Sequence, residues 1–286
     1  AFTSSRPSPA SWAADSSVPG ESVLPASASS TFVSRVACVK SQFDGYTAIE
    51  DLKVKGDLTL GENVAARLSA VYTKEDGYVE NLSTAPGTED PFGTDGDLTV
   101  RGQIAFGDTD STQLLLYGLY SDLNGSGVAM HYLERNIGGP PPTQALLRTM
   151  PADPTDPLTV NNDAVSYNDT ETTMAFARFT HDFGPVDFVL QAGVLNQDAN
   201  VQQDFDGSPV NISIFNKDQT NEAETLEFRL TSDTEGPLTW IVGAYYFSEE
   251  TYALRRVRLR GLTPGGQISL PDFLLDEWGD SSTWAG

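Results

Sequence analysis

The sequence predicts an all-β protein whose antiparallel strands form part of an outer-membrane β-barrel. Three observations carry this prediction. Apolar and polar residues alternate over segments of about ten residues, which is typical of strands with two different faces. Short turns and long connections follow one another in strict alternation. No segment favours a helix of ordinary length, and no window holds the roughly 18 apolar residues of a membrane-spanning helix.

The composition narrows the class of protein. The chain has 286 residues, a net charge of −23 and a pI near 4.2. Such acidity argues against nucleic acid as a partner, because phosphate contacts need Lys and Arg. The single cysteine, Cys38, excludes an intrachain disulfide and a cysteine-based zinc site. His131 and His181 lie far apart and in no catalytic context. We therefore expect no catalytic residue, no metal ligand and no cofactor.

The first forty residues differ from the rest of the chain. Residues 1–40 are rich in Ser, Ala and Pro and show no sustained period, so we expect them to be disordered. The strand pattern occupies residues 41–286. The chain begins with Ala rather than Met and shows no secretory signal, which leads us to expect a processed or truncated part of a longer protein.

Four hairpins account for about eight strands. Each joins two strands through a short turn rich in Gly, Asp, Asn or Pro. The expected strands are 47–60 and 63–74, 96–107 and 112–123, 170–182 and 186–197, and 222–233 and 238–256. The short turns lie at 61–63, 108–111, 184–185 and 235–237, and the long connections at 75–95, 124–169 and 198–221. Residues 257–286 are expected to be irregular.

The order of the connections indicates how the strands would lie in a membrane. In outer-membrane barrels the tight turns lie at the periplasmic rim and the long loops at the external rim. We therefore expect the four turns to share one rim and the three long connections the other. The strand from Leu238 to Tyr246 rises about 3.3 Å per residue, so at a tilt near 40° it spans roughly 20 Å of membrane depth.

The two sides of each strand predict two environments. We expect lipid, or the interfacial girdle, to contact the apolar side, whose candidates are Leu226, Phe228, Leu230, Trp240 and Tyr246. We expect the water-filled lumen to contact the charged side, whose candidates are Arg67, Arg101, Arg178, Glu227 and Arg229. Aromatic residues gather toward strand ends, as in the girdles of membrane barrels. A soluble β-sandwich with one wet face gives the same alternation, so this alternative stays open.

Acidic residues of the third long connection allow a second interpretation. The segment Asp-Phe-Asp-Gly at 204–207 has a spacing that can begin a calcium-binding loop, but the rest of that pattern is missing. A solvated acidic loop, which also includes Asp198 and Asp218, is the favoured interpretation. Four Asn residues match the pattern of glycan acceptors, a match that is common by chance: Asn81, Asn124, Asn168 and Asn211.

Several segments resemble TonB-dependent outer-membrane receptors. In that family a strand ending in Glu-x-Arg-Leu precedes a short turn and a strand of the type Trp-x-x-Gly-x-Tyr-Tyr. Here the matching residues are Glu227, Arg229, Leu230, Trp240, Gly243, Tyr245 and Tyr246. The segment with Asp76-Gly77-Tyr78 and Asn81, and the hairpin with Arg101 and Asp122, are similar to further family segments. The resemblance covers residues 43 to 256 and is closest to the receptors that import iron–siderophore complexes.

The resemblance implies a function and its partners. It implies energy-coupled uptake of a scarce nutrient across the bacterial outer membrane. The nutrient that it favours is an iron–siderophore complex. TonB would supply the energy through a plug domain, but residues 1–40 match neither a plug nor a TonB-binding box. Eight strands are also far fewer than the roughly 22 of the family. We therefore expect a partial barrel with free edges near 47–60 and 238–256, not an enzyme, that does not transport alone.

Two other functions remain open at this point. One is a passive channel or structural barrel without a plug, and the other is a soluble β-sandwich binding module. The substrate is open as well, because haem, vitamin B12 and oligosaccharide receptors share this barrel style. In the family the charged lumen residues often contact the plug, whereas the simpler alternative is that they pair with one another across neighbouring strands.

Overall fold

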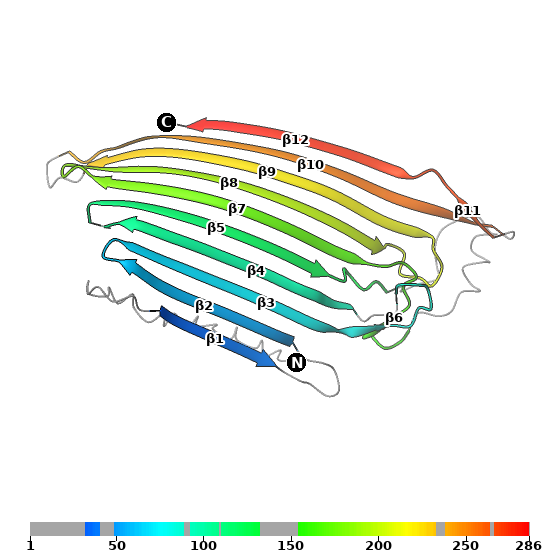
Figure 1. Cartoon of the computed structure of the whole chain (residues 1–286). Helices are drawn as coiled ribbons and strands as arrows, with labels where there is room; N and C mark the ends of the chain where they lie inside the picture. Colours follow the sequence, from blue (N-terminus) through cyan, green and yellow to red (C-terminus); the bar gives the residue numbers. More distant parts are fainter. Residues whose placement is uncertain are drawn as a thin grey trace, which may run out of the picture.

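The computed structural model describes residues 32–40, 49–88, 92–108, 110–131, 154–232, 238–263 and 266–285. In these ranges the chain forms one sheet of twelve strands, almost wholly antiparallel, and no helix (Figure 1). Residues 1–31, most of the segment expected to be disordered, lie outside the described residues. None of the described residues belongs to a helix with the length and hydropathy needed to cross a membrane.

The sheet follows the order of the sequence. The strand order is β1-β2-β3-β4-β5-β7-β8-β9-β10-β11, with β12 paired to β10 and the short β6 paired to β3. The strands are β1 Phe32–Lys40, β2 Ile49–Gly61, β3 Val64–Asn81, β4 Phe92–Gly107, β5 Thr112–Gly125, β6 Thr159–Val160, β7 Tyr167–Asp182, β8 Val186–Asp204, β9 Ser213–Ser232, β10 Ile241–Thr263, β11 Gly266–Ser269 and β12 Phe273–Ala285.

The two rims of the sheet carry different connections. The short β2–β3, β4–β5 and β7–β8 turns lie at one rim, at the left in Figure 1, and the longer connections lie at the other. The predicted split into a turn rim and a loop rim is thus confirmed for these three turns. The fourth turn, 235–237, lies outside the described residues, but Ser232 N–H donates to Trp240 O across the start of the β9–β10 ladder at the turn rim.

The strand map needs correction at its ends. The described residues form twelve strands rather than about eight. β1 lies inside the segment expected to be disordered, and β12 lies inside 257–286, which was expected to be irregular. The connection expected at 198–221 is mostly strand, because β8 continues to Asp204 and β9 begins at Ser213. Both sides of β8 and β9 are mostly polar in this region, so the backbone ladder continues where the apolar alternation that identifies strands has stopped.

The sheet is a single layer with little core. Among the described residues the buried hydrophobic side chains are Val160, Ala164, Val189, Ile214 and Ala253. Large apolar side chains on the sheet stay exposed, such as Val194 at 50% and Val242 at 56%. A soluble sandwich would cover such a face with a second sheet about 10 Å away. The described residues form one layer, so the sandwich alternative is wrong.

The sheet does not close on itself. β1 and β12 lie at its two edges, and no ladder joins them within the described part of the chain. The predicted edges near 47–60 and 238–256 are therefore displaced by one strand each, because β2 pairs with β1 and β10 pairs with β12. An open, curved antiparallel sheet is what the sequence predicts.

Candidate functional site

Cross-strand register places the charged candidates on one face of the sheet. Residues directly opposite each other in an antiparallel pair project to the same side. Arg178 lies opposite Gln191, and Gln191 lies opposite Glu227, so these three share a face with Arg229, two residues along β9. Arg67 and Arg101 join this face through the same register, by way of Gln103, Tyr117 and Phe176. We call this side the charged face.

Three of the five charged candidates have partners on the charged face. Arg67 Nε lies 2.5 Å from Oδ1 of Asp57, the residue directly opposite on β2. Arg229 Nη1 lies 3.5 Å from Glu227 Oε1, and Gln191 Nε2 donates to Glu227 Oε2 at 2.6 Å. These side chains are partly exposed, so each ion pair contributes little to stability, about 0–1 kcal/mol.

Two arginines of the charged face differ from the others. Arg101 and Arg178 are exposed, and neither forms an ion pair with another described residue. Arg101 lies between Ser69 and Leu119, and Arg178 between Leu115 and Gln191. Near the turn rim Arg178 also lines a recess of about 420 Å³. Further residues that line this recess are Gln113, Thr180, Val189, Arg229 and Thr231. Within the described part of the chain, the charged face therefore carries two guanidinium groups without an ion-pair partner.

The opposite side of the sheet carries an apolar band. We call this side the apolar face; Leu226, Phe228, Leu230 and Tyr246 lie on it, and Trp240 immediately precedes β10. Two adjacent cross-strand rows form its centre. The first is Val64, Phe106, Leu114, Phe179, Leu190, Phe228 and Ala244, and the second is Ala66, Ile104, Leu116, Ala177, Ala192, Leu226 and Tyr246.

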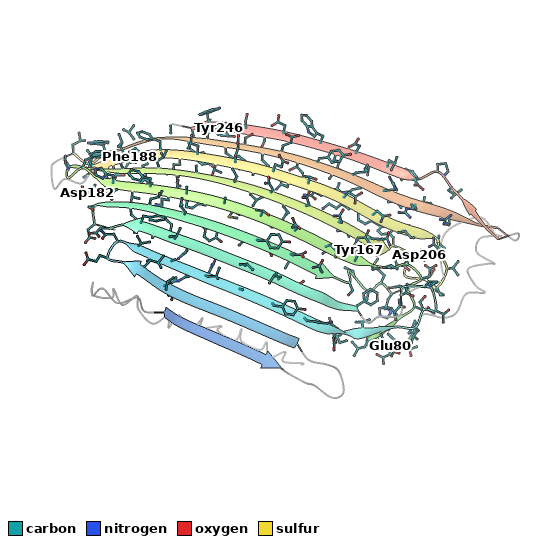
Figure 2. The ribbon with its side chains drawn as sticks, viewed as in Figure 1. Glu80, Tyr167, Asp182, Phe188, Asp206 and Tyr246 are labelled. Carbon is teal, nitrogen blue, oxygen red and sulfur yellow. The ribbon has the colours of Figure 1, made fainter. Side chains whose placement is uncertain are left out.

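Aromatic residues lie at the turn-rim limit of the apolar band and within it. Near the turn rim the ring of Phe188 lies edge-on to those of Phe179 and Phe228, with centroids 5.9 and 5.6 Å apart. Toward the loop rim Tyr246 stacks on Trp284 of β12 at 4.4 Å, and its hydroxyl donates to Glu224. Figure 2 shows Phe188 at the turn-rim end and Tyr246 farther along the sheet. The rings near the turn rim lie where one aromatic girdle of a membrane barrel would be.

The longest strands continue beyond the apolar band. β8, β9 and β10 have 19, 20 and 23 residues. On the apolar face of β8 the apolar side chains end at Val194, and Asn196 and Asp198 follow; on β9 Glu224 and Glu222 lie beyond Leu226. A bilayer that covers the band leaves the loop-rim ends of these strands in water.

A buried carboxylate organises the loop rim. Asp204, the last residue of β8, has no solvent exposure and accepts four backbone hydrogen bonds. Its Oδ2 accepts the N–H groups of Asp163 and Ala164 at 2.9 and 3.3 Å, and its Oδ1 accepts those of Asp206 and Gly207 at 3.2 and 2.8 Å. This one side chain therefore ties the segment before β7 to the β8–β9 loop.

Two further aspartates complete this cluster. Asp206 accepts the N–H groups of Ser208 and Ser213 and the Ser208 hydroxyl, and burial raises the pKa of its carboxyl to about 6. Burial raises the pKa of Asp163 to about 7, and the charges of Asp204 and Asp206 raise it further. Burial also raises the pKa of Asp204, against the opposing effect of its backbone donors. We call Asp163, Asp204 and Asp206 the rim cluster; Figure 2 shows Asp206 at the loop rim.

The rim cluster corrects the interpretation of the acidic motif at 204–207. Asp204 and Asp206 are not part of a solvated loop, because their carboxylate oxygens accept hydrogen bonds from backbone N–H groups and from a hydroxyl group. Among the described residues no group of three His, Cys, Asp or Glu side chains is arranged to hold a metal ion. Asp198 and Asp218 are exposed, as expected. The Asp-x-Asp-Gly spacing signalled a tight turn rather than a calcium loop.

A ladder of asparagines joins the other connections of the loop rim. Asn81 Oδ1 accepts the N–H of Asn162 at 3.0 Å, and Asn81 Nδ2 donates to Asn162 O at 2.9 Å. The buried Asn162 side chain forms the same pair of bonds with the backbone of Met130. The Asn81 amide is therefore engaged inside the fold rather than offered as a glycan acceptor. Sequence reasoning missed Asn162, because no local period marks it.

A β-bulge shapes a pocket at the same rim. The β3–β4 register shifts between Glu75 and Val79, so Asp76, Gly77 and Tyr78 are not matched by partners on β4. The pocket beside this bulge has a volume of about 480 Å³. Its lining includes Glu75, Tyr78, Phe92, Val128, His131 and Leu158. Bulges recur next to binding sites because they redirect side chains.

Comparison with known proteins bears on the fold. No protein-family model and no curated protein matches the chain. Among solved structures, the siderophore receptor PiuA of Acinetobacter baumannii superposes with a TM-score of 0.53 at 13% identity, over 87% of this chain and 38% of that one. The ferric yersiniabactin uptake receptor FyuA of Yersinia pestis superposes with a TM-score of 0.51 at 10% identity, over 83% of this chain and 41% of that one.

The sheet has the fold of a siderophore-receptor barrel wall. The chain spans about two fifths of the length of each of these receptor chains. The identity is low, so the match establishes the architecture of the receptor barrel and not a ligand.

Proposed function

We propose that the chain is part of the wall of an outer-membrane receptor for TonB-coupled uptake of a scarce nutrient. The nutrient that we favour is an iron–siderophore complex. One observation carries the proposal: a receptor-barrel sheet with an apolar band on one face and charged residues on the other. In this proposal the apolar face contacts lipid and the charged face lines the lumen. The turn rim then faces the periplasm and the loop rim the exterior.

The two receptors named above support the nutrient class. PiuA is a siderophore receptor, and FyuA is an uptake receptor for ferric yersiniabactin. The acidic loop rim favours a neutral or cationic complex over a strongly anionic one, because like charges repel. TonB is proposed to act through a plug domain, and Arg101 and Arg178 are the residues we propose for docking that plug. A receptor role needs no catalytic residue, and we propose none.

Uptake by the source bacterium tests the proposal. The coding region for residues 41–286 is deleted, and entry of ⁵⁵Fe bound to a panel of siderophores is measured under iron limitation. We expect entry of at least one iron complex to be lost, and the same entry in the parent strain to stop when a protonophore abolishes the proton-motive force. Diffusion of a small sugar serves as the control and should not change.

The same measurements separate the proposal from a passive channel. Loss of sugar diffusion, without any energy-dependent iron entry, would identify a channel. Unchanged entry of every iron complex would contradict an iron receptor.

Charge reversal tests the proposed plug contact. We expect Arg101→Glu and Arg178→Glu together to reduce energy-coupled uptake in the complete receptor while the amount of folded protein in the outer membrane stays the same. Arg101→Gln with Arg178→Gln is the matched control for charge removal and should show a smaller loss. Unchanged uptake with both charges reversed would leave these arginines without a docking role.

A further inference from the structure

The rim cluster joins two loops through a single pair of carboxyl groups. The segment containing Asp163 and Ala164 precedes β7, and the segment from Phe205 to Ile212 connects β8 to β9. Asp204 Oδ2 accepts hydrogen bonds from backbone N–H groups of the first segment, and Asp204 Oδ1 accepts them from backbone N–H groups of the second. The Asp163 backbone N–H lies 2.9 Å from Asp204 Oδ2, and a side-chain hydrogen bond to Asp204 is one of the causes that raise the pKa of the Asp163 carboxyl. Two carboxyl groups this close form a hydrogen bond only while one of them holds a proton.

The local packing leaves Asp204 no access to water and Asp163 only partial access. Asp204 and Ser208 have no exposure, and Ala164 is 5% exposed. Gly207 adopts a φ of +67° and packs within 3.1–3.2 Å of the backbone of Met130 and His131, measured from the position a Cβ would take. Two ionised carboxylates at such a site repel each other with little screening. Loss of the shared proton therefore acts directly on the bonds that hold the two loops together.

No ion pair between described residues involves either carboxyl group of the pair. The charged and titratable groups on neighbouring elements are His131, Asp156, Asp206, Lys217, Arg256, Arg258 and Arg260. Arg260 Nε donates to Asn211 Oδ1 at 3.3 Å, and its backbone N–H donates to Ile212 O. Asp206 adds negative charge beside Asp163. Lys217 lies on the other face of β9. Arg258 lies opposite Ile214, and Ile214 lies opposite Asp204, so Arg258 and Asp204 share a face. Their backbones are two strands apart, about 10 Å. His131 bonds to Pro157 O, and the Asp156 carboxylate accepts from Leu158 N–H.

We propose that Asp163 and Asp204 form a proton-dependent latch between the two loops of the loop rim. With one proton shared between the two carboxyl groups the latch is closed, and the β8–β9 loop is held against residues 163–164. When that proton is lost, the carboxylates repel and the loops separate. The latch itself does not depend on the nutrient. Control of the latch by the pH of the external medium rests on the proposed function, in which the loop rim faces outside.

Hydrogen exchange of the backbone tests the latch without any transport assay. The full chain in detergent micelles is exchanged at pH 5.5, 7 and 8.5, and rates are corrected for the intrinsic pH dependence of exchange. We expect protection of the peptides covering residues 163–166 and 205–212 to fall roughly tenfold or more from pH 5.5 to pH 8.5, the range in which one proton is lost. Peptides from the β7–β8 hairpin, residues 176–192, should keep their protection.

Two variants sharpen the test. Asp163→Asn keeps a hydrogen-bond donor toward Asp204 but has no proton to lose at that position, so we expect the loss of protection above pH 7 to disappear and only the change that Asp206 causes at lower pH to remain. Asp198→Asn changes an exposed carboxylate on the same strand and should keep the wild-type response. Protection that is flat with pH in the wild type would overturn the latch, and so would an unchanged pH response in Asp163→Asn. The wild-type series alone decides the matter if that variant does not fold.

Discussion

Leu226 and Glu227 are neighbours on β9 that project to opposite faces of the sheet. Leu226 lies opposite Ala192 and Tyr246 within the apolar band, whereas Glu227 lies opposite Gln191 and accepts a hydrogen bond from it at 2.6 Å. One step along the strand thus separates the proposed lipid side from the proposed lumen side.

This relationship predicts unequal costs for two substitutions on β9. We expect Leu226→Arg to destabilise the protein in lipid vesicles by about 2–4 kcal/mol, because it places a charge in the apolar band. Arg229→Leu should cost less than about 1 kcal/mol, because its ion pair with Glu227 is partly exposed. The free energy of unfolding in vesicles measures both, and the reverse order of costs would mean that the two faces have been exchanged.

Loss of the Asp204 carboxylate should loosen the loop rim. We expect Asp204→Asn to cost roughly 2–4 kcal/mol of local stability, because an amide NH₂ cannot accept the backbone donors that the second oxygen now holds. Limited proteolysis should then cut within residues 205–212. Asp218→Asn, an exposed change on β9, is the control, and equal cleavage of both variants would argue against an anchoring role.

The half-buried Asp163 and Asp206 should make the loop rim more stable in mild acid. The folded-state pKa values of Asp163 and Asp206, about 7 and about 6, lie above the ordinary carboxyl value of 3.8. The folded state therefore binds more protons than the unfolded state between about pH 4 and pH 7, so stability falls as pH rises through that window, by at most about 1.4 kcal/mol per pH unit for each group. Urea unfolding followed at the loop rim at pH 5 and pH 8 measures the effect, and greater stability at pH 8 would contradict it.

The bulge in β3 should not tolerate a side chain at its centre. A Cβ on Gly77 would lie 1.8 Å from Phe92 O, so we expect Gly77→Ala to displace the start of β4 and cost about 1–3 kcal/mol. Gly61→Ala is the matched control, because a Cβ there meets nothing within 4 Å. Faster hydrogen exchange of residues 92–94 in the first variant alone would agree with this geometry, whereas equal exchange in both would not.

The open edges predict that the isolated chain makes no stable pore. β1 and β12 leave backbone N–H and C=O groups unpaired, which is costly in lipid and promotes aggregation in water. We expect the chain to aggregate or be degraded when expressed without detergent, and to give no steady conductance in a planar bilayer after refolding in detergent. A monodisperse, heat-modifiable species with steady conductance would show that the strands close a barrel by themselves.

The sequence predicted the parts of the sheet that lie in the apolar band. Leu226, Phe228 and Leu230 alternate with charged residues because the two faces meet different media, and this alternation also locates the turns of the first three hairpins. It could not predict β12 or the outer ends of β8 and β9, where Asn196 and its neighbours are polar on both sides and only the backbone ladder sustains the strand.

The rim cluster was beyond prediction for a different reason. Asp163 and Asp204 are 41 residues apart, and their contact depends on how the long connection before β7 returns to the sheet. The Asp-x-Asp-Gly spacing indicated a turn at 204–207, but nothing local shows that Asp204 is buried or that its donors come from two segments. The pairing of Asn81 with Asn162 is hidden in the same way.

The order of the strands also bears on how the molecule reaches its folded state. From β1 to β5, and again from β7 to β10, each strand pairs with the next one in the chain, so these ladders form between segments that are near in sequence. The Asn81–Asn162 bonds span 81 residues and close only after several hairpins are in place. Because closing a long loop costs entropy before any contact repays it, the loop rim is expected to order last. An intermediate with a formed sheet and an unordered loop rim is thus the natural late species on the folding pathway.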